Sequence, residues 1–248
     1  MTWFEEKFNN GYSGVRKPLY PRVLRVEREP LFSISLTAKI IITNVVFFLL
    51  FYILVLFFGY NFMIDNIAIK AENILAGRKI WTFFSHFWMH GGVTHLFVNM
   101  FSLASIGILV EKIIGKKRYF WFYIISGIFA ALFFVLLAGF FGNNKIGEAI
   151  FGSPSTYAVG ASGAIFALAG LLTILIPRMK VLVFFIIPMP LWIGIVFLLF
   201  LFWVLSIVGG LPIGNSAHLG GFIFGLFYGL YLRSKYPNKT RMIRRIFS

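Results

Sequence analysis

Residues 40–64 read IIITNVVFFLLFYILVLFFGYNFMI and contain no charged side chain. A helix needs about 20 apolar residues to cross the hydrocarbon core of a bilayer, so this stretch predicts a membrane-spanning helix. The composition agrees, because 59% of the residues are hydrophobic and only 12% are charged, against about 25% charged in a typical soluble domain. Four further stretches also lack formal charge: 80–110, 119–144, 149–177 and 181–232.

The last of these stretches is too long for one helix, and it contains residues that end helices and build loops, namely Gly209, Gly210, Pro212 and Gly214. We therefore divide it into spans near 191–208 and 217–232. The sequence predicts an all-α, polytopic membrane protein with six transmembrane helices. This excludes soluble enzymes, disordered chains and disulfide scaffolds, and the absence of cysteine excludes thiolate metal sites and cysteine nucleophiles.

With 248 residues, the chain is expected to hold one domain with short tails. We expect an N-terminal tail at 1–36, a six-helix core at 37–232 and a basic C-terminal tail at 233–248. The first tail has no apolar core of a signal peptide. Its first eight residues, with aromatic side chains beside charged ones, suggest either a short interfacial helix or a solvated tail.

Basic residues are distributed unevenly about the six predicted spans. Six spans place both termini on one side, and all but four of the 23 Lys and Arg residues fall on that side; the four are Lys70, Arg78, Lys79 and Lys145. Because basic loops stay in the cytoplasm, we expect a multi-pass protein of the cell membrane with both termini cytoplasmic. The net charge of +15 is then a topology signal. It predicts contact with membrane lipid and no nucleic-acid partner.

Polar side chains inside the predicted spans are the candidates for function, since such groups are costly in hydrocarbon. His95 and Asn99, one helical turn apart, lie near the start of the second span, Ser162 near the start of the fourth, and His218 near the start of the sixth. These three spans run in the same direction across the membrane. At a rise of about 1.5 Å per residue, the four side chains are expected at a similar shallow depth below the outer face.

Serine and histidine at one level suggest nucleophilic catalysis. A serine hydroxyl is a weak nucleophile until a base takes its proton, and His218 can be that base for Ser162. The Ser162 backbone N–H, the Asn99 amide and the His95 ring are candidate donors to the oxyanion of a tetrahedral intermediate. No acidic residue is positioned by the sequence to orient His218. The pattern therefore predicts a Ser–His dyad that works without a cofactor.

Small residues indicate which predicted helices can approach closely. In the sixth span a glycine recurs at every fourth position, at Gly221, Gly225 and Gly229. In the fourth span the small residues are Gly163, Ala167 and Gly170, spaced by four and three positions. Such faces let helix backbones pack tightly. Ordinary helix packing fully explains these small residues. Because the two helices can then approach closely, the Ser162 hydroxyl can come within reach of the His218 ring.

Two alternative chemistries compete with the dyad. His86 and His90, with His95 nearby, could hold a cation. However, no carboxylate accompanies them, and Gly91 and Gly92 interrupt the helix that would present the three rings, so we predict no metal site. Intramembrane His and Asn could also line a transport path, but the two halves of the chain lack the duplication common in transporters.

Three runs occur in order on alternate predicted spans: WTFFSHFWMHGGVTHLFVNM at 81–100, GASG at 160–163 and AHLGGFIFG at 217–225. Together they closely resemble the rhomboid family of intramembrane serine proteases, over about residues 37–232. The resemblance implies a serine endopeptidase that hydrolyses peptide bonds in or next to transmembrane segments of other membrane proteins through an acyl-enzyme.

The resemblance also implies a role for each matching position. Ser162 matches the nucleophile, His218 the general base, and His95 and Asn99 the oxyanion-stabilising pair. We expect structural support from five further residues: His90, Gly160, Gly163, Gly221 and Gly225. The family implies in addition a water-filled cavity open outward, and a gate for substrate helices formed by the fifth span and the loop around 209–216.

Two positions depart from the family pattern. Thr82 follows Trp81 where many members have arginine, so the hydrogen bonds of that loop must differ. Phe166 stands where many members have a tyrosine stacked on the catalytic histidine, so the ring is kept and the hydroxyl is lost. Some rhomboid-like proteins lack the dyad and only bind membrane clients. This chain keeps both Ser162 and His218, which favours the enzyme over that alternative.

Overall fold

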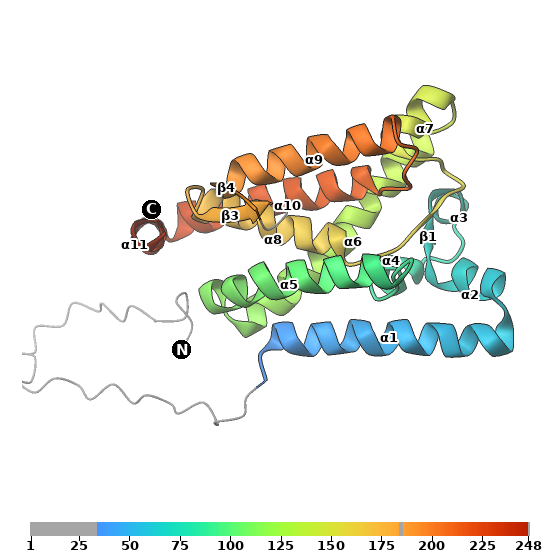
Figure 1. Ribbon diagram of the computed structural model, residues 1–248, viewed down its shortest axis with the longest axis horizontal. Helices are drawn as coiled ribbons and strands as arrows, with labels where there is room; N and C mark the ends of the chain where they lie inside the picture. Colours follow the sequence, from blue (N-terminus) through green and yellow to red (C-terminus); the bar gives the residue numbers. More distant parts are fainter. Residues whose placement is uncertain (1–33, 184–185, 248) are drawn as a thin grey trace, which may run out of the picture.

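The computed structural model describes residues 34–183 and 186–247. Within them, the six longest helices form a bundle: α1 (Leu36–Phe58), α5 (Val93–Ile114), α6 (Lys116–Phe141), α8 (Ser162–Leu175), α9 (Leu191–Ile207) and α10 (Asn215–Lys235). Figure 1 shows α1, α5 and α9 running along the long axis of the molecule. Most side chains of α8 are buried, because α10, α6, α5 and α9 surround it. The helix suggested for the first eight residues lies outside the described part of the chain.

In the described part, three helices are long and apolar enough to cross a membrane: α1, α5 and α6. Two more are apolar but shorter, α8 with 14 residues and α9 with 17. The side chains of α1 that face away from the bundle are large and apolar, among them Leu49, Leu56 and Phe57. Large apolar surfaces of this kind are costly in water. The fold is therefore that of a helical membrane protein.

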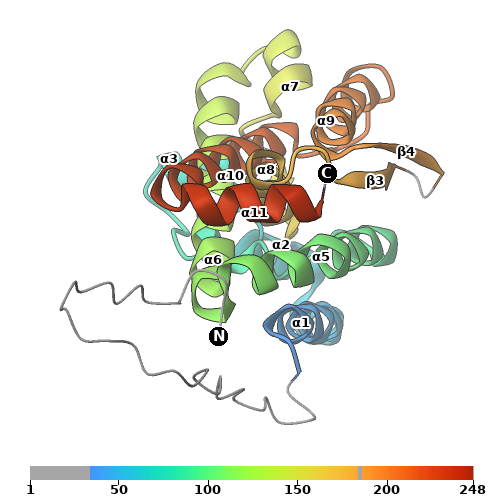
Figure 2. The same cartoon turned by 90° about the vertical axis from the view of Figure 1, so that its left-hand side faces the viewer.

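Short elements occupy the two ends of the bundle. The α1–α5 connection, residues 59–92, contains α2 (Tyr60–Ile67), β1 (Ile69–Lys70), α3 (Ala71–Leu75) and α4 (Thr82–Ser85), and lies at the same end as α7 (Lys145–Phe151) and β2 (Tyr157–Ala158). At the opposite end lie β3 (Lys180–Val183), β4 (Ile187–Pro190) and α11 (Pro237–Ile246). The start of α1 lies at that end too (Figure 1), and Figure 2 shows α11 crossing the end of the bundle.

The structure is mostly helical, as the fold class predicted, but the prediction missed two short antiparallel strand pairs in the described part of the chain. β1 pairs with β2, and β3 pairs with β4. Strands of two to four residues are too short for an alternating pattern to be recognised in a largely apolar sequence. The first pair matters for the candidate site, because β2 comes just before Ser162 and β1 belongs to the α1–α5 connection.

Two helices begin later than the uncharged stretches suggested. α5 starts at Val93 and not near residue 80, because the consecutive glycines at 91 and 92 have low helix propensity. α8 starts at Ser162 and not near residue 149. The intervening α7 ends at Gly152, whose φ of 90° suits glycine and stops the helix. Lack of charge identifies apolar sequence, but it does not show where a helix breaks.

The tightest contact in the bundle joins α8 to α10. A Cβ atom at Gly221 would lie 1.9 Å from the carbonyl oxygen of Gly163, and one at Gly225 would lie 2.0 Å from that of Ala167. Only glycine fits at such distances, so the two backbones touch along one face of each helix. This contact brings the N-terminal ends of α8 and α10 together.

A buried carboxylate fixes the start of α1 against α5. The side chain of Glu111, in α5, accepts hydrogen bonds from the backbone N–H groups of Leu36 and Thr37 at 2.9 and 2.8 Å, and from the Thr37 hydroxyl at 2.7 Å. The first N–H groups of a helix have no partner within the helix. A carboxylate satisfies them and also interacts favourably with the positive end of the helix dipole.

Candidate active site

Ser162 and His218 meet where α8 and α10 begin. Ser162 is the first residue of α8, and His218 lies in the first turn of α10. The Nε2 atom of His218 and the Oγ atom of Ser162 are 2.8 Å apart, within hydrogen-bond distance. Since 56 residues separate them in the chain, the pairing depends on the close contact between the two helices. A hydroxyl bonded to an imidazole is the arrangement that activates a serine nucleophile.

Aromatic rings hold the His218 imidazole in place. The Phe166 ring, one turn along α8, stacks on it with a centroid distance of 4.5 Å and an angle of 23° between the planes. The Phe202 ring, from α9, lies 5.7 Å away. Phe166 thus supplies the stacking contact expected at its position. The contact from Phe202 was not foreseen, because nothing in the α9 sequence distinguishes it from its many apolar neighbours.

The second nitrogen of His218 has no carboxylate partner in the described part of the chain. The Nδ1 atom is buried and makes no hydrogen bond there. A Ser–His–Asp triad would place an acid at this nitrogen to orient the ring. Here the orientation comes from stacking and from burial, since His218 is only 7% exposed. In the described part of the chain, Ser162 is thus the one side chain that forms a hydrogen bond with the His218 ring.

The His95 ring lies beside Ser162, with Gly160 between them. A Cβ atom at Gly160 would be 2.9 Å from both Cε1 and Nε2 of His95 and 3.9 Å from the Ser162 Oγ. With a φ of 118°, Gly160 also has a backbone conformation that suits glycine. Two independent constraints therefore favour glycine at this position, and the close approach of the backbone leaves the His95 ring edge near Ser162.

Hydrogen bonding assigns the proton of the His95 ring. The Nδ1 atom faces the Gly91 backbone N–H at 3.3 Å, so it acts as acceptor. In the neutral ring the proton then resides on Nε2. That N–H is on the side of the ring that faces Gly160 and Ser162, which is the position required of a donor to an oxyanion.

Asn99 is tied to its own helix. Its Nδ2 atom donates to the His95 carbonyl oxygen at 2.9 Å, and its Oδ1 atom is buried without a hydrogen-bond partner in the described residues. The amide has two N–H groups, so one of them is left for another acceptor. The structure therefore brings Ser162, His218 and His95 into one cluster, with Asn99 attached to that cluster through the backbone of His95.

The two remaining histidines, His86 and His90, contact residues in or next to this cluster. The His90 ring is fully buried, 5.2 Å from the His95 ring. The His86 ring bonds the Thr82 carbonyl oxygen at 2.8 Å, and the His86 carbonyl oxygen accepts from the Gly160 N–H at 2.9 Å. Among the residues that the structure describes, no group of three His, Asp or Glu side chains is arranged to hold a metal ion.

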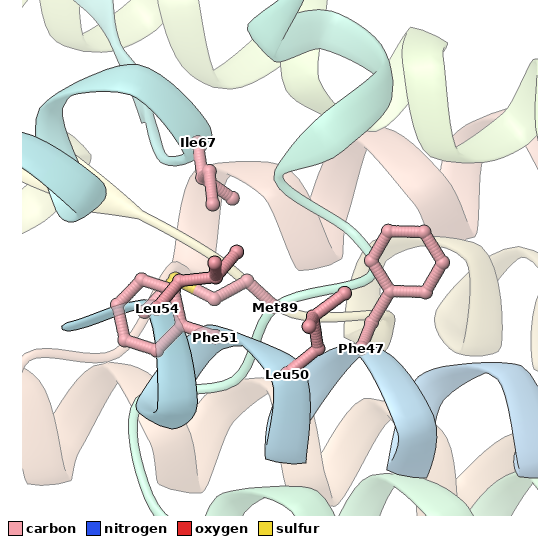
Figure 3. A pocket seen from close by; sticks show the side chains of 6 residues that line it. All are labelled: Phe47, Leu50, Phe51, Leu54, Ile67 and Met89. Atoms are coloured by element: carbon pink, nitrogen blue, oxygen red, sulfur yellow. The ribbon is translucent and has the colours of Figure 1, made fainter. Parts of the chain in front are cut away.

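A separate cavity of about 100 Å³ lies between α1 and the α1–α5 connection. Figure 3 shows its six lining side chains, all apolar: Phe47, Leu50, Phe51, Leu54, Ile67 and Met89. None of them can act as an acid, a base or an oxygen nucleophile. The candidate active site is therefore defined by the polar cluster and not by this cavity.

Comparison with known proteins identifies relatives of this chain. A family model of the rhomboid domain matches residues 77–235. RHOMBOID-like protein 5 of Arabidopsis thaliana is 35% identical over 174 residues, which cover 68% of this chain and 50% of the relative. Rhomboid protein 1, mitochondrial, of Saccharomyces cerevisiae is 34% identical over 167 residues, covering 65% and 43%. Inactive RHOMBOID-like protein 8 of Arabidopsis thaliana is 33% identical over 157 residues, covering 63% and 39%.

This chain belongs to the rhomboid family. The matched region includes the α1–α5 connection from residue 77 and every residue of the polar cluster. The chain spans about half, or less, of the length of the relatives named above. Because one of them carries the word inactive in its name, the activity of this chain has to be argued from its own residues.

Proposed function

We propose that this protein is an intramembrane serine endopeptidase that hydrolyses peptide bonds in or next to transmembrane segments of other membrane proteins. The observation that carries the proposal is the distance of 2.8 Å between His218 Nε2 and Ser162 Oγ. An imidazole nitrogen at this distance can accept the hydroxyl proton as the oxygen attacks a carbonyl carbon. Family membership supports the same reading.

The reaction follows from the two side chains. Ser162 Oγ forms a bond to the scissile carbonyl carbon while its proton passes to His218 Nε2. The tetrahedral intermediate collapses as His218 gives that proton to the leaving amine, which leaves the acyl group esterified to Ser162. A water molecule then attacks the ester, losing a proton to His218, and the second collapse returns that proton to Ser162 Oγ. No cofactor is required by this sequence of steps.

The negative charge that develops on the carbonyl oxygen in the tetrahedral intermediate must be stabilised by hydrogen-bond donors. The His95 Nε2–H and the Ser162 backbone N–H are the proposed donors, with the second N–H of Asn99 as a third. Preorganised donors of this kind typically contribute about 2.7–4 kcal/mol each to transition-state stabilisation. His90, Gly160, Gly163, Gly221 and Gly225 are proposed to support this arrangement, the first by packing beside His95 and the glycines by permitting close backbone contacts.

The setting of the reaction is a membrane. We propose that the six long helices all cross it, that both termini are cytoplasmic, and that the protein lies in the cell membrane. The basic residues concentrated on one side of the predicted spans support this orientation, as does the position of α1's start and α11 at the same end of the bundle. The substrates are transmembrane proteins, whose helices must unwind locally to expose a carbonyl group.

The test is reconstitution of the full chain in liposomes with a generic single-span substrate. Ser162→Ala and His218→Ala should each abolish cleavage, and a fluorophosphonate should label the parent but not Ser162→Ala. Ser105→Ala is the matched control, because Ser105 bonds only a carbonyl of its own helix. Turnover by Ser162→Ala comparable to that of the parent would refute the nucleophile.

The same reconstitution separates the alternatives. Activity that persists in EDTA is expected of a dyad, whereas loss of activity in EDTA and recovery with a divalent metal would favour metal-assisted hydrolysis. A parent protein that binds the substrate without cleaving it, and that the fluorophosphonate does not label, would be a non-enzymatic family member.

A further inference from the structure

The segment that leads into Ser162 is held from outside the helix bundle by the α1–α5 connection. The Glu72 N–H donates to the Pro154 carbonyl oxygen at 3.1 Å, and the Gly160 N–H donates to that of His86 at 2.9 Å. Between these two bonds, β2 pairs with β1. Figure 1 shows the chain between α7 and α8 passing along β1 before it enters the bundle. The last residues before the nucleophile thus rest on a second part of the chain.

One side-chain hydrogen bond reinforces this backbone pairing. The Tyr157 hydroxyl, in β2, donates to Asp65 Oδ1 at 2.9 Å, across 92 residues of sequence. The other Asp65 oxygen bonds the Lys79 ammonium group, and Asn73 Nδ2 lies 3.5 Å from Oδ1. The partners from the α1–α5 connection therefore fix the carboxylate, and the carboxylate in turn fixes Tyr157.

The position of Tyr157 bears directly on the dyad. Tyr157 lies five positions before Ser162, and the chain between them has little freedom. The Gly160 backbone is bonded on one side to His86 and pressed on the other against the His95 ring, where a Cβ atom would be only 2.9 Å away. Because the chain between β2 and Ser162 is held at Gly160, a displacement of β2 also moves Ser162. The distance between the Ser162 hydroxyl and the His218 ring then changes.

Stability alone does not account for the network well. Asp65 and Lys79 keep 37% and 21% of their side-chain exposure, and exposed ion pairs contribute only about 0–1 kcal/mol to folding. Catalysis is more sensitive to position, since a misplacement of about 1 Å can lower the rate by a factor on the order of 100. The network fits a positional role better than a role in holding the fold together.

We propose that Asp65 is a positioning residue of the candidate active site, acting through Tyr157 to fix the strand that presents Gly160 and Ser162 to the His95 and His218 rings. The inference rests on the proposed protease function. Among the described residues, the Asp65 carboxylate bonds Asn73, Lys79 and Tyr157, so it acts on the reacting groups through Tyr157. The substrate-cleaving parent is therefore the reference for every measurement below.

The experiment compares Tyr157→Phe, Asp65→Ala and the double variant with the parent, as full chains in liposomes. We measure kcat and KM on a single-span substrate, the rate of fluorophosphonate labelling, and the melting temperature. Each single change should lower kcat and the labelling rate about tenfold, with KM nearly unchanged. Because both changes remove the same bond, the double variant should be no worse than the poorer single variant.

Two further variants sharpen the result. Asp65→Asn keeps an acceptor for the Tyr157 hydroxyl and should recover most of the kcat lost in Asp65→Ala. Asn66→Ala removes the side-chain amide of the residue next to Asp65, which donates to the Phe62 carbonyl oxygen of its own helix at 2.8 Å, and should leave kcat unchanged.

The outcomes are distinct. Unchanged kcat and labelling in Tyr157→Phe and Asp65→Ala would overturn the positioning role. So would losses that add in the double variant and follow the melting temperature, because those describe a purely structural bond. A parent that neither cleaves substrate nor reacts with the fluorophosphonate would instead refute the protease function, and this is seen before any variant is compared.

Discussion

The carbonyl oxygen of Gly163 lies 1.9 Å from the point where any other residue at position 221 would place its Cβ atom. Gly163 directly follows Ser162, and Gly221 lies one turn after His218. The contact between these two glycines is therefore next to the dyad on both helices. It sets the separation of α8 and α10 at the level of the reacting groups.

Gly221→Ala should disrupt the dyad. The added methyl group meets a backbone oxygen that cannot rotate away, so α8 and α10 must separate, and the hydrogen bond of 2.8 Å between Ser162 and His218 lengthens or breaks. We expect fluorophosphonate labelling to fall by about two orders of magnitude. Gly127→Ala in α6 is the control, because its methyl group would meet its neighbours at 3.5 Å or more. Equal labelling of the parent and Gly221→Ala would show that the helix separation does not control the dyad.

Asn99→Ala and His95→Ala should affect turnover more than substrate affinity. Donors to an oxyanion act in the transition state and not on the bound substrate, so their removal lowers kcat and leaves KM nearly unchanged. For His95→Ala we expect a loss of about 100- to 1,000-fold in kcat. Steady-state kinetics on a single-span substrate provides the check. A change confined to KM would argue against an oxyanion role.

Glu111→Ala should destabilise the fold without touching the candidate site. It would leave the N–H groups of Leu36 and Thr37 and the Thr37 hydroxyl without their shared acceptor. Buried donors without a partner cost about 1–3 kcal/mol each, so we expect a loss of about 2–4 kcal/mol in the free energy of unfolding. Denaturation in mixed micelles measures it. Glu148→Ala, at an acidic residue in the first turn of α7, is the control and should change stability far less.

The free energy of unfolding should fall as the pH drops below the usual pKa range of an aspartate. The hydrogen bond from Lys79 holds the pKa of Asp65 below its usual value, and the Tyr157 hydroxyl and the Lys79 charge act in the same direction. A carboxylate with a lowered pKa in the folded state adds stability that is fully present above its unfolded pKa. That stability is lost as the pH falls through the folded pKa. Lys70, which also faces Asp65, adds to the positive surroundings.

The measurement for this prediction is the melting temperature from pH 7 to pH 3. Because Asp65 keeps 37% of its side-chain exposure and solvent screens its charge, its contribution is expected to be small, within about 1 kcal/mol. The Asp65→Asn variant should show a flatter dependence on pH than the parent in the acidic part of the range. Identical curves for the two proteins would mean that Asp65 has the same pKa in the folded and unfolded chains.

The sequence was informative where chemistry depends on residue type. Apolar stretches without charge predict membrane helices because no other structure buries so much hydrocarbon, and α1, α5 and α6 have the expected length and hydropathy. Ser162, His218 and His95 stand out because polar groups are rare in such stretches. The expectation that they share one level follows from their places near the starts of their helices, and the structure brings the three residues together.

The rest depends on contacts that no local pattern encodes. Tyr157 and Asp65 are separated by 92 residues, and neither lies in an apolar stretch where a polar residue is conspicuous. The end of α7 depends on Gly152, and one glycine among 24 does not reveal its φ angle. Phe202 is one of 32 phenylalanines, so only the fold could place its ring beside His218.

The length of α8 has a consequence for where water is needed. Fourteen residues make a helix about 21 Å long, whereas the hydrocarbon layer is about 30 Å thick. A helix this short spans only part of that layer, so in the proposed six-span arrangement the chain before α8 must enter the layer before the helix begins, which places Ser162 below the outer surface. For the proposed hydrolysis, the protein itself must then provide a path for water to Ser162, and a residue that narrows this path would slow the release of the acyl group.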